Sequence, residues 1–202
     1  NQNFAPALSH WGTSVIMDGE FTEDKSFLFT ALNDAYINVA SGATAPLVSL
    51  RLAPSVDYGI ARGFGIRNLI NRSQLTLQTV GITAQRTFLI TCKLNSEASA
   101  FENEDNWEPA GNGSIGQYFD HSSVSATLTG GDTIFEFFTD DGQTRFATTE
   151  KTLDVVRELG NSILGGNNIF PDGPDVLTVF CTNISGNSGN IRGRVSWSEA
   201  QG

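Results

Sequence analysis

The residues of this chain that could act in acid–base chemistry concentrate in one polar stretch, FENEDNWEP at 101–109. Its carboxylates are Glu102, Glu104, Asp105 and Glu108. Glycoside hydrolases need two carboxylates about 5–9 Å apart around the sugar, and Trp107 offers an aromatic platform beside them. A stretch this polar between predicted strands is more typical of a solvated loop. Sugar binding without catalysis ranks above hydrolysis, with Trp107 and Tyr118 as the rings that could stack on a sugar.

The other candidate chemistries lack partners in the sequence. His10 and His121 each lie in a polar loop, and a Ser–His–Asp arrangement needs a histidine beside a nucleophile and a carboxylate. No G-x-S-x-G turn is present. The glycine-rich stretches GFG (63–65) and LGGNN (164–168) lack the strand and helix context of a phosphate-binding loop. The sequence therefore predicts no catalytic residue and no enzymatic activity.

Metal and cofactor sites are not predicted, with one alternative left open. Acidic loops occur at 18–20, 139–143 and 171–175, but none has the spacing of an EF-hand, and calcium needs about six to eight oxygen ligands. The loop PDGPD (171–175) is better explained as turns set by its proline and glycine residues. Two cysteines and two distant histidines are too few for zinc. A structural Ca²⁺ in an acidic loop is the remaining alternative.

The two cysteines lie in apolar, strand-like runs, Cys92 in TFLITCKLN and Cys181 in VLTVFCTNI. Buried cysteine behaves as a small hydrophobic residue, and thiols stay reduced in a cytoplasm. We therefore predict two buried, reduced thiols. A disulfide would require the two strands to pair.

Composition limits the class of protein. A chain of 202 residues and 21.7 kDa suits one domain, or a domain with an arm. Its 12 basic and 22 acidic residues give a net charge of −10, which repels phosphate backbones and argues against nucleic-acid binding. No apolar run reaches the ~18 residues of a membrane helix, so membrane insertion is not expected. The chain begins at Asn1, which indicates a processed product or a piece of a longer protein.

Alternation of apolar and polar residues with a period of two dominates the chain. In RTFLITCKLN (86–95), Phe88, Ile90 and Cys92 fall on one face, which is typical of a half-buried strand. The other strand candidates are the first half of 26–39, 74–83, 132–139, 144–149, 176–184 and 191–199. At least seven strands separated by turn signals predict an all-β fold, an antiparallel β-sandwich resembling a jelly roll.

Two local signals refine this prediction. Leu153, Val156 and Leu159 recur at three-residue spacing after Thr152, a residue that can cap a helix, and predict one short helix over 152–159. The tetrapeptide DDGQ (140–143) predicts a hairpin turn between two strands.

The best internal boundary is SGATAP (41–46), which is short and rich in small residues. It divides the chain into residues 1–45, an N-terminal arm or first strands, and residues 46–202, the β-sandwich domain. TSVIM (13–17) within the first part could form an edge strand.

Residues 50–202 carry a resemblance to a known family. It is strongest in LRLAPSVDYG, INRSQLTLQTVGI, LGNSILGG, FPDGPDVLTV and the terminal RVSWSEAQ. These segments resemble a domain of virion structural proteins from marine tailed bacteriophages, the T4-like phages of cyanobacteria. The resemblance implies a place in a virion assembled in the bacterial cytoplasm, and it brings no catalytic residues to this chain.

Together these observations predict a virion structural protein that self-assembles as a capsid decoration, neck, tail or fibre module. Its partners would be copies of itself and other virion proteins. Candidate subunit contacts are Phe21, Phe27, Phe29, Arg62, Arg67 and Arg72, since aromatic residues and arginine are favoured at interfaces. The alternative is a receptor- or glycan-binding module of a phage fibre that binds a host-surface glycan. That module would keep Trp107 and Tyr118 facing solvent, whereas an assembly module would bury Trp197.

Overall fold

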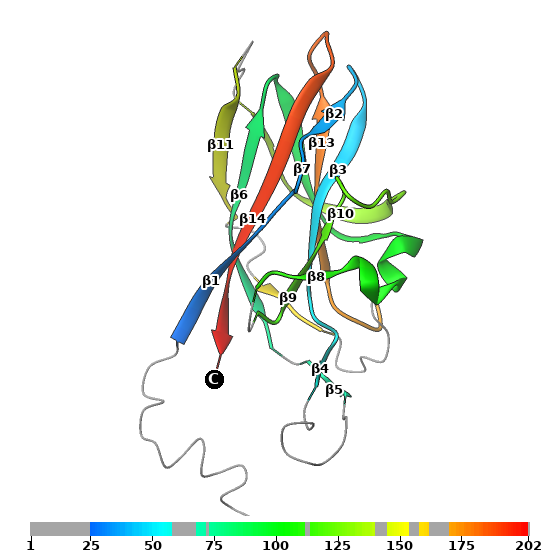
Figure 1. Ribbon diagram of the computed structural model, residues 1–202, viewed down its shortest axis with the longest axis vertical. Helices are drawn as coiled ribbons and strands as arrows, with labels where there is room; N and C mark the ends of the chain where they lie inside the picture. Colours follow the sequence, from blue (N-terminus) through cyan, green and yellow to red (C-terminus); the bar gives the residue numbers. More distant parts are fainter. Residues whose placement is uncertain are drawn as a thin grey trace, which may run out of the picture.

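The computed structural model describes residues 25–57, 68–71, 73–111, 114–139, 145–153, 158–161 and 170–201. Within this part of the chain, two six-stranded antiparallel sheets pack face to face as an elongated sandwich (Figure 1). This confirms the predicted all-β antiparallel sandwich. None of the helices in the described ranges is long and apolar enough to cross a membrane.

The first sheet, sheet A, consists of β1 (Lys25–Leu32), β2 (Ile37–Val39), β6 (Leu75–Ala84), β11 (Ala147–Thr152), β12 (Glu158–Leu159) and β14 (Gly189–Gln201). β14 lies in its interior, with β1 and β2 on one side and β6 on the other. β6 pairs on its far side with β11 and β12. Sheet A is therefore organised around one long strand close to the C-terminus.

The second sheet, sheet B, has the order β10 (Thr129–Phe138), β7 (Phe88–Glu97), β13 (Val176–Asn183), β3 (Thr44–Leu52), β9 (Gly116–Asp120) and β8 (Glu108–Pro109). A separate two-stranded sheet pairs β4 (Ser55–Asp57) with β5 (Asn68–Ile70). Each sheet is thus built from strands that are far apart in sequence.

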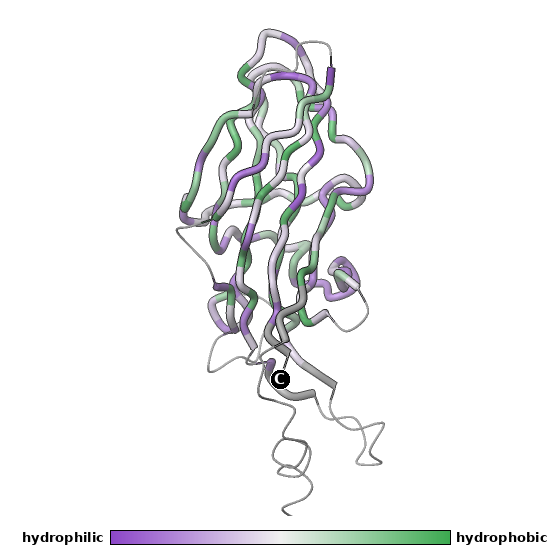
Figure 2. The backbone as a smooth tube through the Cα atoms, turned by 90° about the vertical axis from the view of Figure 1, so that its left-hand side faces the viewer, coloured by the Kyte–Doolittle hydropathy of each residue, from purple (hydrophilic) through white to green (hydrophobic). Residues whose placement is uncertain are grey.

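The main core lies between the sheets and follows the alternation in the sequence. Leu75, Leu77, Val80 and Ile82 of β6 are buried in it, and apolar and polar residues alternate along the strands (Figure 2). The break in alternation between Leu77 and Val80 is a β-bulge, because the register with β14 shifts between Ser196 and Trp197. A bulge inserts one extra residue and restores the inward face beyond it.

A second, smaller apolar cluster covers part of the outer face of sheet B. It contains Phe101, Trp107 and Phe119, with Ala98 and Val176. The segment over this face carries two short 3₁₀ turns, η3 (Ser99–Glu102) and η4 (Glu104–Asn106). The polar stretch that the sequence places in a solvated loop is therefore docked on the sheet by its aromatic residues.

The helix predicted over 152–159 is wrong at both of its ends. Thr152 is the last residue of β11, and Glu158–Leu159 forms β12. Residues 154–157 lie outside the described residues. Leu153 and Leu159 are buried, and the backbone N–H of Leu153 donates to the carbonyl of Gln78 in β6. The residues at both ends of the predicted helix therefore pair with β6, on its edge away from β14. Three-residue spacing in the sequence does not reveal such long-range pairing.

The hairpin predicted at DDGQ is also corrected. β10 pairs with β7 in sheet B, whereas β11 pairs with β6 in sheet A, so the two strands do not pair with each other. Residues 140–144 lie outside the described residues. A turn signal is local and does not determine whether its flanking strands share a sheet.

The division between residues 1–45 and 46–202 falls within β3, which runs as one strand from Thr44 to Leu52. β1 and β2 pair with β14 in the same sheet. The division into an N-terminal arm or first strands (1–45) and a β-sandwich domain (46–202) stays a prediction, and TSVIM (13–17) lies outside the described residues.

The prediction of free, buried thiols is confirmed. Cys92 and Cys181 are both unpaired and fully buried. β7 and β13 do pair, but Cys92 lies opposite Val179 and Cys181 opposite Ile90, so the cysteines are diagonal neighbours. Diagonal positions are about 7–8 Å apart, beyond the usual reach of a disulfide.

These thiols should react slowly in the folded protein. Burial raises the pKa of Cys92 and of Cys181 to about 12, so little thiolate forms at neutral pH. We expect titration with a disulfide reagent to show almost no fast-reacting thiol in the native state and two on denaturation. Two rapidly reacting thiols without denaturant would contradict the burial.

Candidate functional site

The predicted subunit contacts are only partly within the described chain. Phe21, Arg62, Arg67 and Arg72 lie outside the described residues, so nothing tests them. Phe27 lies in β1 opposite Glu199 in the register with β14.

Phe29 is described in full. It is half-buried and stacks on Trp197, with ring centroids 6.2 Å apart. Trp197 itself is completely buried. Phe29 therefore belongs to the edge of the core and contributes little free surface.

Trp107 is buried instead of exposed. Only 4% of it is accessible, and its indole N–H donates to the carbonyl of Phe101 at 3.0 Å. The guanidinium carbon of Arg51 lies 4.1 Å from the centroid of the Trp107 ring. The rings of Phe101 and Phe119 pack against it from other directions. Its faces are thus occupied by this chain, and no open indole face is left for a sugar.

Arg51 is the ion-pair partner of one of the clustered carboxylates, Glu104. It is fully buried, and it donates to Glu104 at 2.9 Å and to Gln117 at 3.0 Å. Burial lowers the pKa of Arg51 to about 10, although the charge of Glu104 opposes the shift. Removing a charge from water requires a compensating partner. Glu104 is that partner, and its role is to neutralise Arg51.

Tyr118 pairs with another of these carboxylates. Its hydroxyl donates to Glu108 at 2.9 Å, and the two residues face each other in the pairing of β8 with β9. Burial and this hydrogen bond raise the pKa of Tyr118 to about 12. Glu108 and Glu104 therefore have separate partners and do not form an acid–base pair around a shared position.

His121 lies at the edge of the smaller cluster, against Phe119 and Phe101. Its Nε2 is 2.9 Å from the hydroxyl of Ser49, which also bonds Thr178 at 2.8 Å. This resembles part of a catalytic triad, but Ser49 is completely buried. Burial lowers the pKa of His121 to about 4, so the imidazole is neutral at pH 7.

The third member of a triad is not in place. Nδ1 of His121 is buried without a hydrogen-bond partner in the described part of the chain. The carboxylate of Asp120 instead accepts hydrogen bonds from the Asn33 side chain at 2.8 Å and from the backbone N–H of Asp34 at 2.6 Å. The cluster therefore holds β3, β9 and the residues after β1 together.

A buried carboxylate near the end of β14 has the richest set of donors. Glu199 is completely buried and accepts from Trp197 Nε1 at 2.8 Å and from the hydroxyl of Ser114 at 2.7 Å. It also accepts from the backbone N–H groups of Ile115 at 2.9 Å and Gly116 at 3.0 Å. Glu199 could not be recognised as a buried site residue from the sequence, because it occupies an ordinary polar position of an alternating strand.

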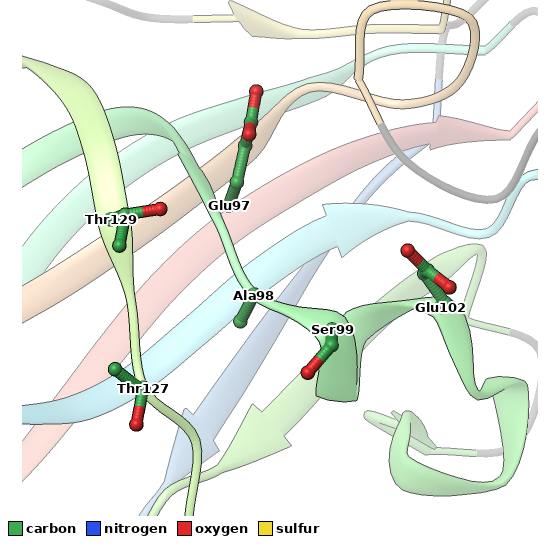
Figure 3. A pocket seen from close by; sticks show the side chains of 6 residues that line it. All are labelled: Glu97, Ala98, Ser99, Glu102, Thr127 and Thr129. Carbon is green, nitrogen blue, oxygen red and sulfur yellow. The ribbon is translucent and has the colours of Figure 1, made fainter.

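A shallow pocket of about 220 Å³ opens where β7 leads into η3 (Figure 3). It is lined by Glu97, Ala98, Ser99, Glu102, Thr127 and Thr129. The carboxylates of Glu97 and Glu102 do not point toward one another. Across the described residues, no group of three or more His, Cys, Asp or Glu side chains is placed to hold a metal ion.

The acidic loop at 171–175 is described in part by its hydrogen bonds. Asp175 accepts from the Asn95 side chain at 3.1 Å and from the backbone N–H of Gly160 at 3.4 Å. The loop at 18–20 and most of 139–143 lie outside the described residues, so a structural calcium ion there stays untested.

Comparison with known proteins identifies no family for this chain: no protein-family model matches it, and no curated protein matches it.

Proposed function

We propose that this chain is a structural module of a tailed-bacteriophage particle that binds copies of itself and other virion proteins and catalyses no reaction. The observation that carries the proposal is the free edge of β1, where two leucines are exposed. The resemblance of residues 50–202 to virion structural proteins supplies the particle as the context. Assembly would take place in the cytoplasm of the bacterial host. Capsid decoration, neck, tail and fibre are the positions that such a module would fit.

The geometry of β1 suits addition of a strand. β1 pairs with β14 on one side, and no strand in the described ranges pairs with its other side. Such an edge presents backbone donors and acceptors to another chain. Leu28 is 71% exposed and Leu32 is 38% exposed, about 13 Å apart on the outer face at ~3.3 Å per residue. A second subunit that adds a strand to β1 and also packs over its outer face would bury both leucines.

The polar clusters support a structural role. Arg51, Ser49, His121 and Glu199 each take part in hydrogen bonds that tie a strand to a turn or loop from a distant part of the chain. A module that binds a glycan through Trp107 is less well supported, because Arg51 and two phenylalanines cover that ring.

Substituting Leu28 tests the proposal. We expect the wild-type chain to form oligomers and Leu28→Glu to weaken their association at least tenfold. Burying a leucine contributes about 1.5–3 kcal/mol, and a buried carboxylate without a partner adds a further penalty. Sedimentation velocity over a range of concentrations measures the change. Phe138→Glu is the matched control, because Phe138 is 61% exposed on the edge strand of the other sheet.

A chain that stays monomeric at every concentration would contradict the proposal. Equal loss of association in Leu28→Glu and Phe138→Glu would place the contact elsewhere. Electron microscopy of purified particles labelled on this domain would locate it directly. A domain absent from every particle would remove the virion context.

A further inference from the structure

Two exposed aromatic side chains from distant parts of the chain meet over sheet A. Tyr36 is 43% exposed and Phe146 is 44% exposed, and their ring centroids are 4.5 Å apart with planes at 37°. Tyr36 directly precedes β2 and Phe146 directly precedes β11. These strands lie at the same end of sheet A, on opposite sides of the β14–β6 pair (Figure 1). The two rings therefore reach toward each other across the outer face of the sheet.

A cation lies beside this pair. The guanidinium carbon of Arg192 is 5.8 Å from the centroid of the Tyr36 ring. Arg192 lies opposite Thr83, whose hydroxyl bonds that of Thr148, and this row belongs to the outer face. Its guanidinium donates to the backbone carbonyls of Asn33 and Asp34. These bonds fix the orientation of the guanidinium. Because their acceptors are neutral carbonyls, they do not neutralise its positive charge.

Arg192 differs from Arg51 and Arg194 in how its charge is compensated. Arg51 pairs with Glu104 and Arg194 pairs with Glu150. No carboxylate in the described chain lies within ion-pair distance of Arg192. At physiological ionic strength the Debye length is about 8 Å. Charges farther away than this are largely screened, so the net charge of −10 on the whole chain does not exclude an anionic ligand beside Arg192.

Besides Arg192, the outer face of the sheet near the rings carries polar, uncharged side chains. The side chains of Asn38 and Asn190 join β2 to β14 by an exposed hydrogen bond of 2.7 Å. Each amide has further donor and acceptor capacity. The exposed Thr83 and Thr148 pair adds two hydroxyls nearby. A standard protein–protein contact buries about 800 Å² per partner and contains an apolar centre. Two rings surrounded by amides and hydroxyls are too small an apolar surface for such a centre.

We propose that this surface, formed by Tyr36, Phe146 and Arg192, is a binding site for an acidic saccharide. The apolar face of a sugar ring stacks on the aromatic pair, and its carboxylate bonds Arg192 through a charge-assisted hydrogen bond. Hydroxyls of the sugar bond the amides of Asn38 and Asn190. The strands of sheet A hold these groups in place before the ligand arrives, which reduces the entropic cost of binding.

The test is binding of the full chain to immobilised glycans that carry uronic or sialic acids, each beside its neutral counterpart. We expect the acidic glycans to bind and the neutral ones to bind at least tenfold more weakly. Tyr36→Ala and Phe146→Ala should each weaken binding roughly tenfold, which corresponds to about 1.4 kcal/mol. Arg192→Gln should remove the preference for acidic glycans, and Arg192→Lys should keep part of it. Phe138→Ala, an exposed aromatic on the other sheet, should bind as the wild type does.

Thermal unfolding of each variant separates lost binding from lost folding. Phe146→Ala is the cleanest variant, since its described ring contact is with Tyr36 alone. Folded wild-type protein that binds no acidic glycan of the panel would overturn the proposal. Equal binding of neutral glycans would overturn it as well. A changed oligomeric state in Tyr36→Ala and Phe146→Ala, with unchanged glycan binding, would identify the surface as a subunit contact instead.

Discussion

Glu199→Ala is expected to lower the free energy of unfolding by roughly 3–5 kcal/mol. The substitution leaves the indole N–H of Trp197, the hydroxyl of Ser114 and two backbone N–H groups without their buried acceptor. Each buried donor left without a partner costs about 1–3 kcal/mol, and the losses are not fully additive. Urea unfolding followed by tryptophan fluorescence measures the change.

Two variants serve as controls for this result. Glu199→Gln keeps the volume and one acceptor oxygen, so it should lie between the wild type and alanine. Glu150→Ala removes an exposed carboxylate from the same sheet, where it pairs with Arg194. Exposed ion pairs contribute only about 0–1 kcal/mol. Similar losses in Glu199→Ala and Glu150→Ala would show that the buried carboxylate does not organise this end of the sandwich.

The second large effect is a loss of stability in acid. The pKa of His121 is about 4 in the folded protein, mainly because of burial, against an ordinary value of 6.5. A lowered folded pKa means that its contribution is complete above pH 6.5 and is lost as the pH falls toward 4. The largest loss from this group is about 3 kcal/mol.

Asp120 acts in the same direction. Burial alone would raise its pKa, but hydrogen bonds from Asn33, Asp34 and Ser122 outweigh burial and lower it. Its contribution is therefore lost at lower pH, as the carboxylate is protonated. We expect urea midpoints to decline between pH 6.5 and 4. His121→Gln, which cannot titrate, should decline less over this window. Parallel curves for the two proteins would exclude His121 as the cause.

Many of the strands could be predicted because their signal is local, but β3, which begins inside the predicted boundary at 41–46, and β9 could not. Alternation in 74–83 and 86–95 marks the inward faces of β6 and β7, and even the bulge at Gln78 appears as a break in that pattern. The partners of each strand could not be predicted. The turn predicted at 140–143 lies between strands of different sheets, and Leu153 and Leu159 contact β6 and are buried in the core.

The placement of the polar residues depends on what covers each sheet. Trp107 lies among four carboxylates in sequence, and polarity favours exposure, yet its ring docks the segment and covers Arg51. Ser49 and Thr178 look like outward residues of strands, and they become buried because the 98–107 segment and the turn after β9 cover that face. Tyr36 and Phe146 are brought together by sheet topology, which no local pattern contains.

The position of β14 has a consequence for the timing of folding. β14 separates β1 from β6, so sheet A has no continuous hydrogen-bonded middle until residues 189–201 have been synthesised. Contacts between such distant residues form slowly, and unpaired strand edges promote aggregation until they form. On a translating ribosome, β1 and the edge of β6 that faces β14 would stay unpaired until this strand is made, although β11 and β12 could already pair with the other edge of β6. We therefore expect this protein to reach its native fold only after β14 has left the ribosome, and a chaperone that shields strand edges should raise the yield of folded protein.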